Sequence, residues 1–316
     1  MSERTGRARG CLLGLAVGDA LGRPAEGLTP EQIADRWGVL RELEPTADGA
    51  PAGTDDTEYA IFVSLLLAEH GHGLTSELVA QAWRDQIVSR TGPMKGAGFS
   101  ELGTVEALRR GLTPPATGQH HHGWSDGLAM RAAPYGVFAA GDPAEAARLC
   151  EVDGRVSHSG EGILGGRAVA AGVAVAMTGA APDAVLSAAL SAIPADSWCA
   201  RSLRRAADAP ERAVRDCVPR HYFWSDLAPE AVALAFAGYL TGDGEVERSV
   251  VAAANQGRDA DTTAAIAGAL AGAGAGETGV PERWARAIAP VRGACLPAVA
   301  GREVRQVAEL LAGRHD

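Results

Sequence analysis

The chain has 316 residues, of which 47% are hydrophobic, 22% charged and only 5% aromatic. A single domain of this length buries roughly three quarters of its unfolded surface, so we predict one domain over residues 1–316, although length alone also permits two. The net charge of −10 argues against nucleic acid or an anionic membrane as a partner.

The cysteines and the N-terminal residues indicate the cellular compartment in which the protein is expected to act. Five cysteines are scattered along the chain without a Cys-x-x-Cys pair, which favours reduced thiols. The charged N-terminus, MSERTGRARG, is not followed by an apolar segment with a cleavage site. The apolar run 163–178 is too short to span a membrane and contains Arg167. We therefore expect a soluble, cytoplasmic protein that does not contact a membrane.

Apolar stretches of helical length recur along the chain and predict an all-α fold, a single compact helix bundle. They lie at 7–18, 57–69, 76–89, 143–150, 162–178, 183–192, 229–240, 246–254, 262–273 and 302–312. Strand-like runs with a period of two are almost absent, and Ala, the best helix former, is abundant. The least regular segments, 41–56, 91–127 and 194–228, hold most of the polar side chains, so we expect them to form the walls of a site.

The first predicted helix is rich in small residues. Gly14 and Gly18 lie one turn apart, which allows a second helix to approach closely. Asp19 is expected to cap or pair with a neighbouring element. Glu26 follows a Gly-Arg-Pro break, so it lies on a loop that can aim it into a site, although a loop glutamate is more often a surface residue.

Residues 53–58, Gly-Thr-Asp-Asp-Thr-Glu, immediately precede the apolar run 59–68. One interpretation is a helix start, with Thr54 as N-cap and acidic residues in the first turn. A cap needs only one acceptor, whereas Thr54, Asp55 and Asp56 offer a hydroxyl and two carboxylates at consecutive positions. That set is typical of ligands for a hard cation, the second interpretation.

Residues 257–263, Gly-Arg-Asp-Ala-Asp-Thr-Thr, open another Ala-rich helix. Asp259, Asp261 and Thr262 present two carboxylates and a hydroxyl, but the remaining positions of an EF-hand are missing. If the two helix N-termini converge, four carboxylates would repel one another unless cations lie between them. Because the ligand set is all oxygen, we predict two divalent cations of the Mg²⁺ or Mn²⁺ class, which suit hydrolysis.

Two further segments carry candidate substrate contacts. In 123–134, Gly and Ser flank Trp124 on a turn. In one interpretation, the Trp124 ring stacks on a substrate group and backbone N–H groups of the turn bind a phosphate. In the other, Trp124 is a structural residue that covers the core. The preceding histidines at 120–122 are expected to be solvated. In 153–162, Ser157 or Ser159 is expected to cap the next helix, and His158 is either a core histidine or a substrate contact.

Five segments, in this order, resemble the ADP-ribosylglycohydrolase family: GDALG at 18–22, GTDDT at 53–57, DGLAMRAAP at 126–134, SHSGEG at 157–162 and GRDADTTAAIAGALAGA at 257–273. The resemblance covers about 10–275. It implies an all-α orthogonal helix bundle with a dinuclear metal site in a central cleft.

The resemblance also implies residue roles. The metal ligands would be Thr54, Asp55, Asp56, Asp259, Asp261 and Thr262, and Glu26 would be the catalytic acidic residue near the reacting ribose. Substrate would contact Gly123, Trp124, Ser125, Asp126, Gly127, Met130 and His158. The implied reaction is metal-dependent cleavage at the anomeric carbon of ADP-ribose attached to a protein side chain or a small molecule.

Asp126 departs from the family pattern, which commonly has Asn before this glycine. An extra negative charge beside a phosphate site favours an alternative, a same-fold hydrolase of another small riboside or nucleoside-like glycoside. A second alternative is a non-enzymatic, crystallin-like protein that binds ADP-ribose. The complete set of Asp residues and Glu26 argue against that second alternative.

Overall fold

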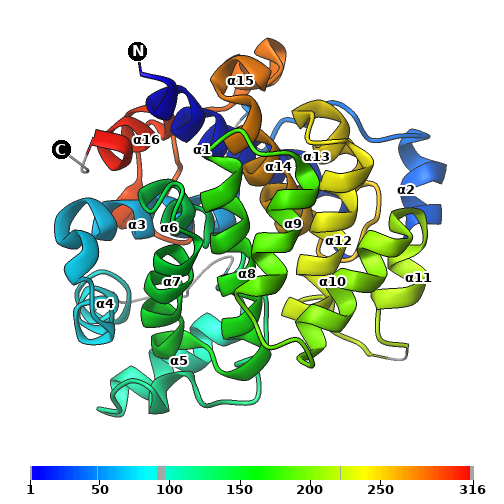
Figure 1. The fold of residues 1–316 in the computed structure, drawn as a ribbon. Helices are drawn as coiled ribbons and strands as arrows, with labels where there is room; N and C mark the ends of the chain where they lie inside the picture. The colour runs from blue at the N-terminus through cyan, green and yellow to red at the C-terminus, as the bar shows by residue number, and fades with distance from the viewer. Residues whose placement is uncertain (1, 48, 91–96, 221, 314–316) are drawn as a thin grey trace.

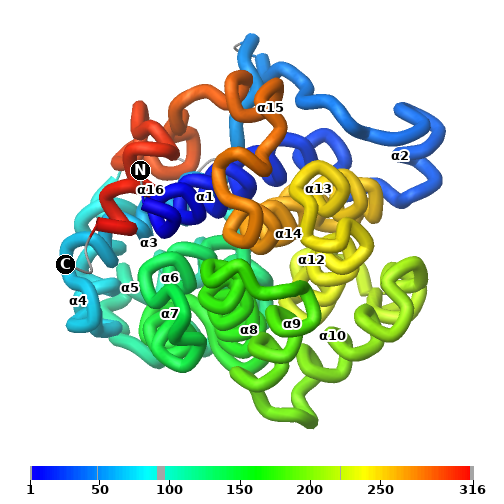
Figure 2. The backbone as a smooth tube through the Cα atoms, turned by 45° about the horizontal axis from the view of Figure 1, so that its top comes forward, coloured from blue at the N-terminus to red at the C-terminus, as the bar shows by residue number. Residues whose placement is uncertain are grey.

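The computed structural model describes residues 2–47, 49–90, 97–220 and 222–313. Two glycine-rich helices, α1 (Glu3–Gly22) and α14 (Ala260–Ala275), lie side by side in its interior (Figures 1 and 2). A Cβ atom added at Gly14 would lie 2.1 Å from the carbonyl oxygen of Gly268, and one at Gly18 would lie 2.0 Å from that of Ala264. Backbone therefore meets backbone, and the close approach predicted from these glycines is confirmed.

The other helices pack around this pair (Figure 1). They are α2 (Pro30–Trp37), α3 (Asp55–His70), α4 (Ser76–Trp83), α5 (Phe99–Arg109), α6 (Ala133–Phe138), α7 (Pro143–Ser157), α8 (Gly160–Ala176), α9 (Pro182–Ser191), α10 (Trp198–Asp208), α11 (Ala213–Cys217), α12 (Ala228–Thr241), α13 (Val246–Ala254), α15 (Glu282–Ala287) and α16 (Val304–Ala312). A π-helical turn, Arg84–Val88, continues α4. The described residues contain no β-strand, which confirms the all-α prediction.

The helices enclose one extensive apolar core. α3 and α16 contact α1 and each other, α12 and α13 pack on α14, and α6, α7, α8 and α9 pack in succession beside them (Figure 2). The core cluster draws buried side chains from α1 through to α16, and alanine supplies many of them. All five cysteines are buried and carry free thiols. None of the described helices is both long enough and apolar enough to cross a membrane.

The expectation of irregular structure was wrong in parts of two segments. Segment 91–127 contains α5, and segment 194–228 contains α10 and α11. α10 exposes three arginines and buries a narrow apolar face around Leu203, so its polar composition hides its periodicity. Residues 91–96 lie outside the described part of the chain, so the expectation for them stays a prediction.

Candidate metal and substrate site

The N-termini of α3 and α14 meet at the end of α1, where three carboxylates converge. Asp19, Asp56 and Asp261 are buried, and each offers an oxygen that lies within 4.8 Å of those of the other two. One oxygen of Asp56 and one of Asp261 are buried without a hydrogen-bond partner. Unpartnered buried oxygens of this kind fit the coordination of a hard cation.

Asp19 has a separate structural task. Its carboxylate accepts hydrogen bonds from the backbone N–H groups of Thr54 (2.7 Å) and Thr57 (3.1 Å) and from both of their hydroxyls (2.9 and 2.5 Å). Thr54 occupies the N-cap position of α3 but makes no capping bond with its own side chain. The prediction that Asp19 caps a neighbouring element is therefore confirmed, and it anchors the start of α3 beside α1.

Glu26 reaches the same place because the loop after α1 pairs with the loop before α14. The N–H of Gly27 donates to the carbonyl of Arg258 (2.7 Å), and the N–H of Arg258 donates to the carbonyl of Leu28 (2.9 Å). Arg258 has a φ of 61°, and its guanidinium binds Glu230 at 2.6 Å. This pairing fixes Glu26 against the start of α14.

A second pairing brings in a segment whose role sequence reasoning missed. Ser125 and Leu227 form an isolated antiparallel bridge. Next to this bridge, the N–H of Asp126 donates to the carbonyl of Asp226 (2.9 Å). The N–H of Ala228 donates to the carbonyl of Trp124 (3.0 Å). The loop at 123–127 is thereby joined to the segment before α12. No local signal in 222–226 marks it as part of a site, apart from three consecutive aromatic residues.

The paired loops and helix ends enclose a pocket of about 500 Å³. Its lining contains most of the predicted site residues: Glu26, Thr54, Asp55, Asp56, Ser125, Asp126, Gly127, Met130, Asp259, Asp261 and Thr262. Glu101 and Asp226, which were not predicted, also line it. Glu101 lies on α5 in line with the buried positions Thr104, Val105 and Leu108, and a charged residue in such a stripe is a signal that could have identified it.

Gly123, Trp124 and His158 lie outside the described pocket lining. Gly123 is buried, and its carbonyl accepts a hydrogen bond from the N–H of Ser159 at 2.9 Å. Trp124 is 45% exposed and packs edge-on against Trp198, with ring centroids 6.4 Å apart. Both residues thus join the loop at 123–127 to neighbouring elements.

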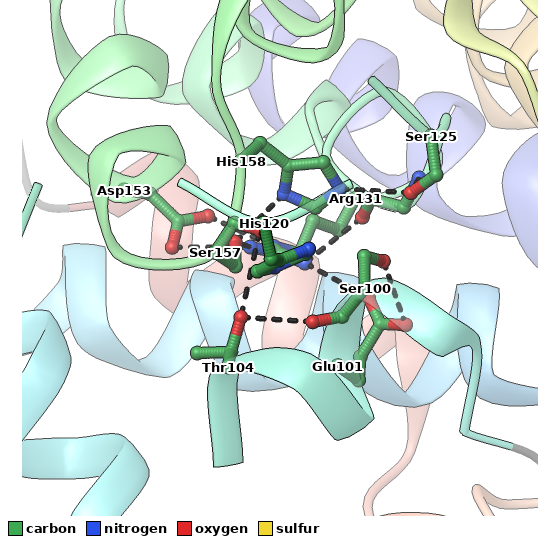
Figure 3. Close-up of polar contacts among 10 residues, drawn as sticks. Ser100, Glu101, Thr104, His120, Ser125, Arg131, Asp153, Ser157 and His158 are labelled. Carbon is green, nitrogen blue, oxygen red and sulfur yellow. Dashed lines mark hydrogen bonds and ion pairs between the residues drawn. The ribbon is translucent and has the colours of Figure 1, made fainter. Parts of the chain in front are cut away.

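His158 is a buried histidine that reaches the pocket through a serine (Figure 3). Its Nδ1 lies 2.8 Å from the hydroxyl of Ser157, and its Nε2 lies 3.1 Å from that of Ser125, which lines the pocket. Burial, followed by the nearby charge of Arg131, lowers the pKa of His158 well below its usual value. The neutral ring is therefore a hydrogen-bonding link between α7 and the pocket wall.

Arg131 holds residues of the pocket wall in place through several polar contacts (Figure 3). It is fully buried and binds Asp153 at 2.9 Å, the carbonyl of Gly127 at 2.9 Å and the hydroxyl of Ser157 at 2.7 Å. Its guanidinium also lies 3.6 Å from Oε1 of Glu101. A buried cation shared between two carboxylates holds Glu101 at the pocket while offsetting its charge.

Comparison with protein families gives a match over almost the whole chain. A family model described as ADP-ribosylglycohydrolase matches residues 1–315. The chain belongs to the ADP-ribosylglycohydrolase family. The protein is therefore an enzyme of the glycohydrolase class, and the general reaction of the ADP-ribosylglycohydrolase family is hydrolysis of a glycosidic bond of ADP-ribose.

Individual relatives extend over similar lengths. A protein of Archaeoglobus fulgidus without an assigned function is 33% identical over 283 residues, which cover 87% of this chain and 89% of that protein. The ADP-ribosyl-(dinitrogen reductase) glycohydrolase of Rhodospirillum rubrum is 25% identical and the ADP-ribosylhydrolase ARH3 of Gallus gallus is 27% identical, each with 88% of both chains covered. A solved structure described as an ADP-ribosylglycohydrolase-related protein complex matches 100% of both chains, with a TM-score of 0.73 and 26% identity.

The carboxylates in the pocket of this ADP-ribosylglycohydrolase carry more negative charge than the neighbouring side chains of the chain neutralise. Burial, and then the charge of Asp19, raises the pKa of Asp56 well above its usual value. Burial, and then Asp126, does the same to the pKa of Asp259, and burial with Glu26 raises the pKa of Asp261 to about 7. Such mutual repulsion is what a bound cation relieves.

Without divalent ions the protein is expected to lose stability as the pH rises from about 4 to about 7. Carboxyl groups with raised pKa values hold protons in the folded state that they release on unfolding in this range, so the free energy of unfolding falls as pH rises. The pKa of Asp261 is raised from 3.8 to about 7. This group alone is therefore expected to lower the free energy of unfolding by on the order of a few kcal/mol, at about 1.4 kcal/mol per unit of pKa.

Melting temperatures measured in EDTA between pH 4.5 and pH 8 would check this expectation. Mg²⁺ or Mn²⁺ is expected to raise the melting temperature more at pH 8 than at pH 5, because ionised ligands bind cations without releasing protons. The Asp261→Asn variant serves as the control, since it lacks one titrating group of the cluster. A wild-type profile that parallels that of this variant would contradict the assignment.

Proposed function

We propose that the protein is a metal-dependent hydrolase that cleaves the glycosidic bond at the anomeric carbon of ADP-ribose attached to a protein side chain or to a small molecule. The observation that carries the proposal is the meeting of Asp56 and Asp261, far apart in the chain, in one buried cluster in which each of these two residues keeps one oxygen without a hydrogen-bond partner. A buried carboxylate cluster of this kind is costly unless it binds a ligand.

The proposed cofactors are two divalent cations, Mg²⁺ or Mn²⁺, held by Thr54, Asp55, Asp56, Asp259, Asp261 and Thr262. All six residues line the pocket and provide only oxygen donors, a set that suits these ions better than Zn²⁺. When bound, the cations supply positive charge that orients the vicinal hydroxyls of the ribose and lowers the pKa of water.

Glu26 is the proposed catalytic acid or base. In the reaction the bond from the anomeric carbon to the leaving atom breaks, a bond to the oxygen of water forms, and the leaving atom gains a proton. Glu26 lies on the pocket wall, and desolvation there, followed by the charge of Asp19, raises its pKa. A carboxyl group with a raised pKa is suited to proton transfer near neutral pH.

The loop at 123–127 is the proposed substrate-binding wall. Ser125, Asp126, Gly127 and Met130 line the pocket and are positioned for direct contact with the substrate. For Gly123, Trp124 and His158 we propose supporting roles, because their contacts are with Ser159, Trp198 and the hydroxyls of Ser125 and Ser157. A cytoplasmic location is also proposed, with which five free thiols agree.

A second candidate is a hydrolase of another small riboside. It is favoured by Asp126, whose carboxylate stands in the wall where a diphosphate would lie in the first candidate. Eight of the twenty described lining residues carry carboxyl groups, and none of the twenty is Lys, Arg or His. An anionic diphosphate meets no cationic side chain among them.

The test is a substrate panel assayed with Mg²⁺, with Mn²⁺ and with EDTA. It contains ADP-ribosyl-arginine, ADP-ribosyl-serine, O-acetyl-ADP-ribose and simple nucleosides, and free ribosyl product is measured by chromatography. Turnover of an ADP-ribosyl compound that EDTA abolishes is the expected result. Turnover confined to nucleosides would select the second candidate, and failure to bind any divalent ion would contradict the proposed metal dependence.

A further inference from the structure

Arg258 has a backbone conformation that is unusual for its residue type. Its φ of 61° lies in the left-handed region, which favours glycine and admits Asn and Asp more readily than arginine. Asp243, in the turn after α12, is the other non-glycine residue with a positive φ in the described part of the chain. Strain of this kind persists where surrounding contacts compensate for it, so the contacts of Arg258 indicate its role.

The backbone of Arg258 is bonded to the loop that carries Glu26. Its N–H donates to the carbonyl of Leu28 (2.9 Å), and its carbonyl accepts the N–H of Gly27 (2.7 Å). The next residue, Asp259, is the N-cap of α14 and one of the proposed cation ligands. The backbone at Arg258 therefore determines where α14 and its proposed ligands begin.

The side chain of Arg258 contacts a different part of the chain. Its Nε lies 2.6 Å from one carboxylate oxygen of Glu230, in the first turn of α12, and its Nη2 lies 3.2 Å from the other. Nη2 also donates to the carbonyl of Trp224 at 3.0 Å. Because Glu230 is only 1% exposed, this two-point contact offsets a buried charge and fixes the direction of the guanidinium.

The segment 222–226, which contains Trp224, has few other attachments. It contains no helix or strand, and three of its residues besides Phe223 line the pocket or adjoin those that do. Its backbone groups take part in three of the described hydrogen bonds: one at Tyr222, one at Asp226 and, between them, the bond that Arg258 donates to Trp224. The bond from Arg258 thus fixes the middle of this part of the pocket wall.

We propose that Arg258 is a positioning residue that holds the segment 222–226 at a fixed distance from the proposed cation ligands at the start of α14. Its backbone belongs to the ligand segment, and its side chain binds the wall segment. A substrate that contacts both segments depends on their spacing, since a misplacement of about 1 Å can cost about 100-fold in rate. The roles of cations and substrate rest on the proposed function, whereas the placement of Trp224 by Arg258 does not.

The test compares three variants of the intact protein. Arg258→Gly removes the side chain, while glycine retains the left-handed backbone. Because this change leaves Glu230 buried without its partner, Arg258→Gly combined with Glu230→Gln is the variant to use if the single one does not fold. Arg258→Lys keeps the charge but lacks the planar fork that reaches Glu230 and Trp224 together. Arg110→Gln, at an exposed arginine at the end of α5, is the control with the same loss of charge as Arg258→Gly.

The first measurement is fluorine NMR of metal-free protein labelled with fluorotryptophan. The resonance of Trp224 is assigned as the one that Trp224→Phe lacks, and the resonance of the buried Trp83 reports that each variant is folded. Removal of the Arg258 side chain is expected to shift or broaden the Trp224 resonance and to leave that of Trp83 in place. Arg258→Lys is expected to give an intermediate spectrum, and Arg110→Gln the spectrum of the wild type.

The second measurement separates cation binding from substrate binding. With glycine at position 258 the affinity for Mn²⁺ is expected to stay within about 3-fold of the wild type, because the backbone of the ligand segment is retained. KM is expected to rise by about 10-fold while kcat changes by less than about 3-fold, since the wall contributes equally to ground-state and transition-state binding. Titration calorimetry and steady-state kinetics measure these quantities, and a merely destabilised protein would not show this division between KM and kcat.

The outcomes distinguish this inference from the proposed function. A Trp224 resonance with the same position and width in wild type, Arg258→Gly, Arg258→Lys and the double variant overturns the proposal, whatever activity the enzyme has. A displaced Trp224 resonance with wild-type KM overturns the role in substrate binding. If the protein binds no Mn²⁺ and cleaves no ADP-ribosyl compound, the proposed function fails, and a displaced resonance in metal-free Arg258→Gly still supports the placement of the wall by Arg258.

Discussion

Asp261→Asn is expected to lower kcat/KM by at least about 100-fold and to weaken Mn²⁺ binding by a similar factor, since even outer-shell partners of a metal contribute 10- to 100-fold. Asp261 is buried, its Oδ1 has no protein partner, and it shares the cluster with Asp19 and Asp56. An amide at this position removes a negative charge from the cation site. Steady-state kinetics and titration calorimetry with Mn²⁺ measure both effects.

The same substitution is expected to stabilise the metal-free protein at pH 8. Burial and Glu26 raise the pKa of Asp261, so ionisation of this group opposes folding above about pH 7. A rise in melting temperature in EDTA, together with lost activity, distinguishes loss of a ligand from misfolding. Asp183→Asn, which changes an exposed aspartate at the start of α9, is the matched control and is expected to leave the kinetics unchanged. Wild-type Mn²⁺ affinity in Asp261→Asn would remove this residue from the ligand set.

Glu26→Gln is expected to reduce kcat by about 10²- to 10⁴-fold, the usual contribution of a general acid or base. Metal content is expected to stay near that of the wild type, because Glu26 lies on the pocket wall and not among the buried carboxylates that converge at the helix ends. Kinetics at saturating substrate, combined with metal analysis of the purified variant, measure the two quantities separately.

Two comparisons support the assignment of Glu26. Glu31→Gln changes an exposed glutamate at the start of α2 and is expected to leave kcat unchanged. Glu26→Ala is expected to regain part of its activity when formate is added, because the side chain is accessible and the missing carboxylate can be supplied from solution. Near-normal turnover by Glu26→Gln would show that this residue takes no part in proton transfer.

Much of the fold could be predicted because long helices carry regular apolar periodicity. All ten predicted helical segments are helical in the structure, and their ends differ by at most four residues, except that α7 continues seven residues beyond its predicted end. The helices that were missed are short or polar. α2 had a usable signal, since Thr29 and Gln32 form a capping box in which each side chain binds the backbone of the other residue. α10 offered less, because its arginines mask a single buried stripe.

Part of the site could also be predicted from local sequence patterns. Asp55, Asp56, Asp259 and Asp261 stand at helix starts, where acidic residues are conspicuous in the sequence. What the sequence does not show is which loops pair in space. Asp226 enters the pocket only because its segment bonds to the loop at 123–127. Contacts between segments a hundred residues apart depend on packing, and no local pattern encodes them.

The contact between α1 and α14 determines which residues of this enzyme can be substituted without altering the fold. Because the glycines of α1 meet the backbone of α14 directly, no side chain there can grow or rotate to alter the spacing of the helices. Asp19 and Asp261 belong to this inflexible pair, whereas Asp126 and Trp224 belong to loops. The spacing of the clustered carboxylates on these two helices can therefore change little, whereas residues of the loops that face them can be substituted one at a time and alter which substrate is accepted.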